Sequence, residues 1–172
     1  MTPPEGDFPP YAFVPGGPYP HPTGSPDGHL ARAEHRKPHP IQDGNWRSSE
    51  SYLRGIALFN AGYYWEAHEE WEGLWHAHGR RGPIADVLKG LIKLAAAGVK
   101  VRQRQRHGVV THAGRAAEAF QAARQTGSEC LLGFDLLVLI LTALDVVAKP
   151  PDYLGSPADR VVCVFEFDLQ PQ

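Results

Sequence analysis

Prolines are concentrated at the start of the chain, where eleven of the 16 lie within residues 1–45. Proline lacks a backbone N–H and clashes with the preceding helical turn, so this segment cannot form helices and should bury little apolar surface. We therefore expect an extended or disordered arm over residues 1–45, solvated along most of its length. The alternative is that the arm packs along the domain or a partner through its aromatic residues Phe8, Tyr11, Phe13 and Tyr19.

The following hundred residues show the periodicity of helices. Ser48 or Ser49 can cap the first helix, which should stop around Asn60, and Pro83 can open the third at its first position. Because the connections are short, consecutive helices should be antiparallel neighbours. We therefore expect an all-α fold, a compact bundle over residues 48–150, whose later helices lie near 63–78, 83–103, 109–125 and 135–148.

The end of the chain carries two further expectations. Residues 135–148 are apolar nearly all round, which predicts the central or most covered helix of the bundle. If one chain does not cover this helix, a homodimer is the alternative. Residues 151–172 should form an extended tail, irregular or strand-like, because residues 161–167 have strand-like composition but no second strand to pair with.

Composition and charge limit the class of protein. The chain has 172 residues, 42% of them hydrophobic, which suits one domain of ordinary size with tails. A net charge of -2 gives no electrostatic footprint for nucleic acid or an anionic membrane, so neither is an expected partner. Two cysteines do not make a disulfide framework, and neither a secretory signal nor a bilayer-spanning segment is visible. We expect a cytoplasmic protein that binds a small ligand or a protein partner.

The densest chemistry lies in residues 63–78, which hold three of the four tryptophans together with three histidines and four glutamates. Glu66 and Glu70 should project into water from the side opposite the core, and Glu69 and Glu72 should lie on the flank between. Titratable groups beside an aromatic, low-dielectric face have easily shifted pKa values, so this helix is the candidate site. Its core-facing stripe consists of Tyr64, Ala67, His68, Trp71, Leu74 and Trp75.

A metal site is one interpretation of this helix. His68 and Glu72 are four positions apart and can converge on one ion, and His112 from another helix could supply a third ligand. Zinc, iron or manganese would accept such mixed nitrogen and oxygen ligands. However, Glu72 stands where a metalloprotease helix has its second histidine, and the two E-x-x-H copies of a di-iron bundle are missing. No cofactor is therefore predicted, and a divalent metal remains an alternative.

Two other interpretations use the same residues. Carboxylates beside a histidine suit acid–base catalysis, although no nucleophile elbow, phosphate-cradling loop or nucleotide fingerprint accompanies them. Alternatively, the residues form a structural network in which Glu72 accepts hydrogen bonds from neighbouring donors: His112, Arg115, Arg102 or Asn60. We favour a binding or scaffold module with a His/Glu/Asn cluster at its core groove, with a metal-assisted or acid–base hydrolase as the alternative. The candidate site residues are Asn60, Tyr64, His68, Glu69, Glu72, Trp75, His112 and Arg115.

Three segments together resemble a known family: FNAGYYWEAHEEWEGLWH (59–76), LKGLIKLAAAGVKVRQ (88–103) and GVVTHAGRAAEAF (108–120). The resemblance is to domain of unknown function 309 and covers about residues 50–125. It implies a compact, all-helical bundle and no particular reaction, and nothing in it explains the Pro-rich arm. His112 and Arg115 match a subgroup that has lysines at 89 and 93. The motif residues that carry over are Phe59, Asn60, Trp65, His68, Glu69, Glu72, Leu74, Trp75, Gly90, Leu91 and Ile92.

Overall fold

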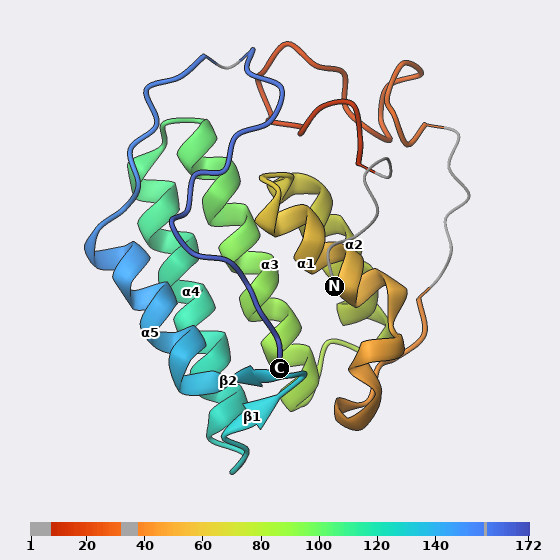
Figure 1. The fold of residues 1–172 in the computed structure, drawn as a ribbon, viewed down its shortest axis with the longest axis vertical. Helices are drawn as coiled ribbons and strands as arrows, with labels where there is room; N and C mark the ends of the chain where they lie inside the picture. Colours follow the sequence, from red (N-terminus) through yellow and green to blue (C-terminus); the bar gives the residue numbers. More distant parts are fainter. Residues whose placement is uncertain (1–7, 32–37, 157) are drawn as a thin grey trace.

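The computed structural model describes residues 8–31, 38–156 and 158–172 (Figure 1). The predicted all-α bundle is confirmed, together with a 3-10 helix and a small hairpin that the periodicity did not reveal. In the described part of the chain, no helix is long and apolar enough to cross a membrane. The elements are η1 (Asp43–Ser48), α1 (Glu50–Asn60), α2 (Tyr64–Ala77), α3 (Pro83–Arg102), α4 (Arg106–Arg124), β1 (Cys130–Leu131), β2 (Phe134–Asp135) and α5 (Leu136–Ala148).

Local sequence signals set several helix ends. Ser49 caps α1, because its side chain accepts a hydrogen bond from the Tyr52 N–H at 3.4 Å. Pro83 occupies the first turn of α3, where a missing N–H costs nothing. The Asp135 carboxylate caps α5 by accepting hydrogen bonds from the first free N–H groups of that helix. Only α4 departs clearly from the prediction, since it begins at Arg106 instead of near Val109.

Consecutive helices lie side by side, as the short connections predicted (Figure 1). Two glycines of α3 allow the close approach of its neighbours. A Cβ atom at Gly90 would lie 2.2 Å from the Phe120 ring of α4, and one at Gly98 would lie 2.6 Å from the Tyr64 ring of α2. The absence of a side chain at these two positions therefore sets how tightly α2 and α4 pack on α3.

The segment between α4 and α5 is a hairpin that is anchored to the start of the bundle. Leu131 pairs with Phe134 in an antiparallel register, and Leu132 and Gly133 form the turn with φ angles of 52° and 81°. The Tyr52 hydroxyl donates to the Leu132 carbonyl at 2.7 Å, and the Asp43 carboxylate accepts from the Leu132 N–H. These contacts join η1 and α1 to a turn some eighty residues later in the chain.

Residues 8–31 of the N-terminal arm form neither helix nor strand, but they run along the domain (Figure 1). Phe8 stacks on Tyr63 with ring centroids 5.3 Å apart, and Phe13 meets Trp65 edge-on at 5.3 Å. The run from Tyr11 to Val14 is buried. The alternative of a packed arm therefore holds for residues 8–14, whereas most of residues 15–31 reach solvent, as the solvated interpretation expected. The boundary near residue 45 stays a prediction.

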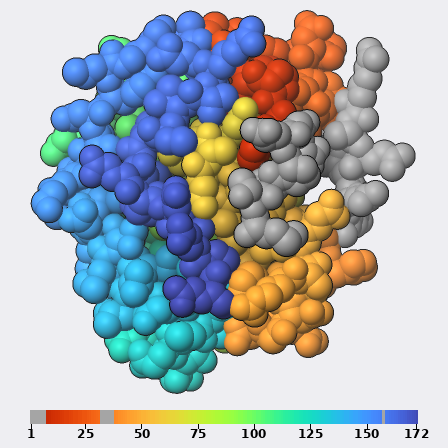
Figure 2. All heavy atoms as spheres, viewed as in Figure 1, coloured from red at the N-terminus to blue at the C-terminus, as the bar shows by residue number. Residues whose placement is uncertain are grey.

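The C-terminal tail is extended, as predicted, and it lies across the bundle between α5 and α1 (Figures 1 and 2). Phe165 stacks on Phe59 of α1 with ring centroids 5.6 Å apart, and Leu169 is buried. The Gln172 N–H donates to the Gly133 carbonyl at 2.8 Å. Aromatic burial and isolated backbone hydrogen bonds thus hold the tail without a partner strand.

The expectation that α5 is the most covered helix is wrong. Its inner side packs against α4 through residues such as Leu139 and Ala143. Its outer side exposes four large apolar residues: Leu137, Val138, Leu141 and Leu144. An apolar pattern all round a helix predicts that all of its sides are covered. It cannot show whether other elements of the same chain cover them.

Candidate functional site

Helix α2 occupies the predicted position and directs its aromatic stripe into the core. Trp71 and Leu74 are fully buried, and the Trp71 indole donates to the Tyr52 carbonyl at 3.3 Å. The opposite side of α2, which was expected to face water, is largely covered in the structure. Glu66 is only 4% exposed because the arm covers it, and Glu70 is half-buried against Arg54 of α1 at 3.2 Å. The prediction for Glu66 is therefore wrong, because the periodicity of one helix cannot reveal a covering segment.

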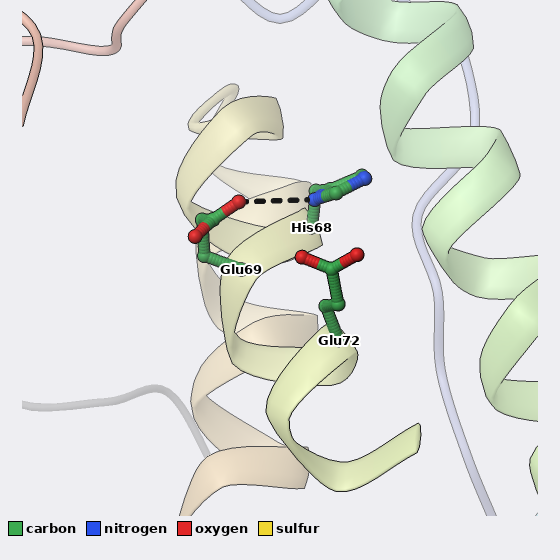
Figure 3. A group of neighbouring side chains, drawn as sticks. All are labelled: His68, Glu69 and Glu72. Carbon is green, nitrogen blue, oxygen red and sulfur yellow. Dashed lines mark ion pairs between the residues drawn. The ribbon is translucent and has the colours of Figure 1, made fainter. Parts of the chain in front are cut away.

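Three residues of α2 form the closest group of metal-ligating side chains in the described residues. One ligand atom from each of His68, Glu69 and Glu72 lies within 4.8 Å of the others. His68 Nδ1 is 3.4 Å from Glu69 Oε1. Figure 3 shows the His68 ring and the Glu72 carboxylate extending to the same side of the helix. His112, the third ligand considered above, is not in this group, and Glu69 takes its place.

Cationic side chains of α3 and α4 lie next to this group. Lys93 is close enough to Glu72 for the carboxylate to act on its pKa, and Arg115 and Lys89 act on it in the opposite direction. Burial is the largest cause, and the pKa of Lys93 is lowered overall. Within the described ranges, neither Lys89, Lys93 nor Arg115 forms a hydrogen bond or an ion pair with a protein group. Their donors are therefore free to meet a ligand.

His112 of α4 reports the electrostatic potential at this place. Burial and the charges of Lys93, Lys100 and Arg115, with a smaller effect of His68, lower its pKa to about 4. At neutral pH the imidazole is therefore uncharged. Its Nδ1 atom is buried and has no hydrogen-bond partner among the described residues. A neutral histidine surrounded by cations indicates a positive local potential, on a chain whose net charge is -2.

We call the set His68, Glu72, Lys89, Lys93, His112 and Arg115 the polar patch. Three helices contribute two residues each: α2, α3 and α4. The side chains of His68, Glu72, Lys93 and His112 are partly buried, whereas Lys89 and Arg115 are exposed. The patch therefore reaches solvent and offers hydrogen-bond donors, one carboxylate and two imidazoles to a ligand.

Two predicted site residues lie elsewhere and hold the tail. The Asn60 amide donates to the Leu169 carbonyl at 2.9 Å and accepts from the Leu169 N–H at 2.8 Å. The Tyr64 hydroxyl accepts from the Val164 N–H at 2.9 Å. Burial is the main reason that the pKa of Tyr64 is raised to about 12, so this phenol stays protonated. Asn60 therefore anchors the tail and is not part of the polar patch.

Trp75, the remaining predicted residue, lies at the C-terminal end of α2. Its ring is tilted against the His76 ring with centroids 5.4 Å apart, and the Arg80 guanidinium lies over it at 5.6 Å. It packs on the core and is only partly buried. These contacts are those of an aromatic residue at the edge of a core.

The spacing of Lys89 and Lys93 carries a sequence signal for this patch. They are four positions apart on α3, and His112 and Arg115 are three apart on α4. Each pair therefore lies on one face of its helix. What the spacing could not show is that α3 and α4 turn these faces towards Glu72.

Comparison with known proteins gives one family match, which covers part of the chain. Residues 52–112 match the model of the family Domain of unknown function (DUF309), from the first turn of α1 into α4. A search of curated proteins found no match. The matched range includes every residue of the polar patch except Arg115.

Proposed function

We propose that this chain, whose residues 52–112 match the DUF309 family model, is a small cytosolic binding module whose polar patch holds a small anionic ligand. A phosphate or carboxylate group is the chemistry that fits. The observation that carries the proposal is the position of Lys93 and Arg115, which form no hydrogen bond or ion pair with other described residues, beside a neutral His112, with Lys89 near Lys93. Like charges that lie close together repel one another, so a bound anion would relieve this repulsion.

Each residue of the patch has a distinct role in this proposal. The Arg115 guanidinium can bind an oxyanion through two parallel N–H donors, and Lys93 adds a point charge from the neighbouring helix. His112 is uncharged at neutral pH, so it contributes one neutral donor or acceptor. Glu72 would accept hydrogen bonds from hydroxyl or amine groups of the ligand and repel a second anionic group. The expected ligand therefore has one acidic end and one hydrogen-bond-donating end.

Calorimetric titration of the full chain with inorganic phosphate and with acetate, which has one carboxylate, tests this proposal. We expect binding that weakens as salt rises, because the contacts are partly exposed. Lys93→Met with Arg115→Met should lower the affinity by about tenfold or more. Arg106→Met is the matched control, because Arg106 is an exposed cation of the same helix that pairs with exposed Asp152. The proposal is wrong if neither anion binds, or if the double variant binds like the parent chain.

The alternative is a metal-assisted or acid–base hydrolase, and the group of His68, Glu69 and Glu72 is the observation that supports it. These side chains would supply one nitrogen and two carboxylate ligands to one divalent ion, leaving further positions for water and substrate. The cations of the patch would then bind the anionic substrate. Metal analysis of protein purified without a histidine tag and incubated with zinc or manganese tests this alternative. Less than about one-tenth of an equivalent of retained metal would exclude a tight metal site.

A further inference from the structure

A cavity of about 210 Å³ lies where the Pro-rich arm passes the end of α3. It is lined by residues 14–17 of the arm and by residues 102–105, which end α3 and lead into α4. Val14 and Arg102 are buried, whereas Arg104 is exposed, so the cavity extends from the interior to solvent. A cavity of about 150 Å³ can hold benzene, so this one has room for a small molecule. We call it the arm cavity.

Arg102 in the wall of the arm cavity is a buried cation whose donors are only partly used. The residue is 3% exposed. Its Nη2 atom donates to the Asp159 carbonyl at 2.6 Å, and its guanidinium lies over the Tyr153 ring at 5.2 Å. Its Nε and Nη1 atoms are buried and have no hydrogen-bond partner among the described residues. A buried charge without a charged, hydrogen-bonded partner is costly, so an anion that pairs with these donors would stabilise the folded chain.

The carboxylate near Arg102 is used by other groups. Asp159 accepts hydrogen bonds from the Tyr153 hydroxyl and the Ser156 N–H. The first of these bonds is the main reason that the pKa of Asp159 is lowered, and the charge of Arg102 adds a smaller effect. Among the described residues, Arg102 and Asp159 form no ion pair. The lining of the arm cavity has two arginines, two glutamines and, within the described part of the chain, no carboxylate, so its potential is positive.

Hydrogen bonds between the arm and the helix end hold the walls of the arm cavity in place. The Gln103 side-chain N–H donates to the Pro15 carbonyl at 2.9 Å. The Lys100 ammonium donates to the side-chain oxygens of Gln103 and Gln105, also at 2.9 Å. The arm turns at Gly16, whose φ of 82° is readily adopted only by glycine. Specific contacts therefore shape both walls, and a molecule bound between them would stabilise the docked arm.

We propose that the arm cavity binds the oxyanion group, carboxylate or phosphate, of a small molecule, which Arg102 holds from the buried side and Arg104 from the exposed side. Arginine suits this role because its planar guanidinium binds an oxyanion through parallel N–H donors. Arg104 also donates to the carbonyls of Leu154 and Gly155, and these bonds hold its guanidinium in place. The site is separate from the polar patch. Arg102 follows Lys93 by nine residues, or about two and a half turns, so the two side chains leave opposite sides of α3.

Titration of the full chain with inorganic phosphate and, separately, with acetate tests this proposal, with the NMR signal of the Arg102 Nε–H group as the readout. We expect at least one anion to shift this signal to saturation below about 50 mM, the range for a weak site. A chain with Lys93→Met and Arg115→Met should show the same shift, because the polar patch is a different site. Arg104→Met should weaken binding about threefold, the effect of one exposed charge. Arg106→Met, which removes an exposed cation outside the cavity, is the matched control and should leave binding unchanged.

The two anions also distinguish the possible ligands. A shift with phosphate alone assigns the cavity to a phosphate group, and a shift with acetate alone assigns it to a carboxylate. No shift with either anion, or unchanged binding in Arg104→Met, would overturn the proposal. A shift that disappears in the chain with Lys93→Met and Arg115→Met would place the anion in the polar patch and would overturn it as well.

Discussion

Glu66 and Phe13 are joined by a hydrogen bond of 2.9 Å, in which the Phe13 backbone N–H donates to Glu66 Oε1. The second carboxylate oxygen of Glu66 is buried and has no hydrogen-bond partner among the described residues. The buried His29 lies beside it, with its Nε2 atom 3.8 Å from Glu66 Oε1. One short contact thus attaches the Pro-rich arm to α2 and removes a carboxylate from water.

This contact makes stability depend on pH. Burial raises the pKa of Glu66 to about 7, whereas an unfolded chain deprotonates this group near 4.5. The folded state therefore holds the proton more tightly between those values, and the free energy of unfolding falls as pH rises from 4.5 to 7. The loss is about 3 kcal/mol at most. Glu66→Gln should be close to the parent chain at pH 5 and more stable than it at pH 8.

Urea unfolding of both chains at pH 5 and pH 8 measures this difference. Comparing the two chains is necessary because His29 acts in the opposite direction. Burial lowers its pKa, so its contribution to stability is lost as pH falls below its ordinary value of 6.5. This effect is common to both chains. A stability difference that stays constant with pH would show that the Glu66 carboxyl is not buried by the arm.

The electrostatics of the polar patch can be read from the titration of His112. Its pKa is lowered to about 4 by burial first and then by Lys93 and the other cations. Lys93→Met should raise it towards 6.5, because one of the neighbouring charges is gone. Histidine NMR signals assigned with a His112→Asn chain provide the measurement. Lys149→Met removes an equal charge from exposed position 149 and should leave the His112 titration unchanged.

Helix spacing at α3 depends on Gly98, where a Cβ atom would lie 2.6 Å from the Tyr64 ring. Gly98→Ala should therefore destabilise the protein by about 1–3 kcal/mol, despite the higher helix propensity of alanine. Gly114→Ala is the control, since a Cβ atom there meets nothing within 4 Å. That variant should gain up to about 1 kcal/mol. Thermal unfolding distinguishes the two, and equal effects would refute the close approach of α2 and α3.

Anchoring of the C-terminal tail depends on the Asn60 amide, which pairs with both backbone groups of Leu169. Asn60→Ala should cost about 1–3 kcal/mol, because it leaves half-buried donors and acceptors unpaired. Hydrogen exchange should rise over residues 161–172 before it rises in the helices. Asn45→Ala, at an exposed position, provides the control. Unchanged protection of the tail in Asn60→Ala would show that the aromatic contacts of Phe165 suffice.

The helices and their order follow from local features of the sequence. Their periodicity, the cap at Ser49 and the start at Pro83 are properties of a few neighbouring residues, and short connections leave consecutive helices little choice but to pack together. The same locality explains why His68, Glu69 and Glu72 were found as one group, because they share adjacent turns of one helix.

Which faces of the helices are covered depends on contacts between distant parts of the chain. Glu66 is buried by residues some fifty positions away, Asn60 is used by a tail more than a hundred positions away, and the outer side of α5 is left open. Likewise, Lys93 and Arg115 belong to one patch only because α3 and α4 pack with their polar faces towards α2. The apolar periodicity of a helix shows which of its faces is buried, but not which element covers that face. The identity of that element depends on contacts between distant residues, which no single segment encodes.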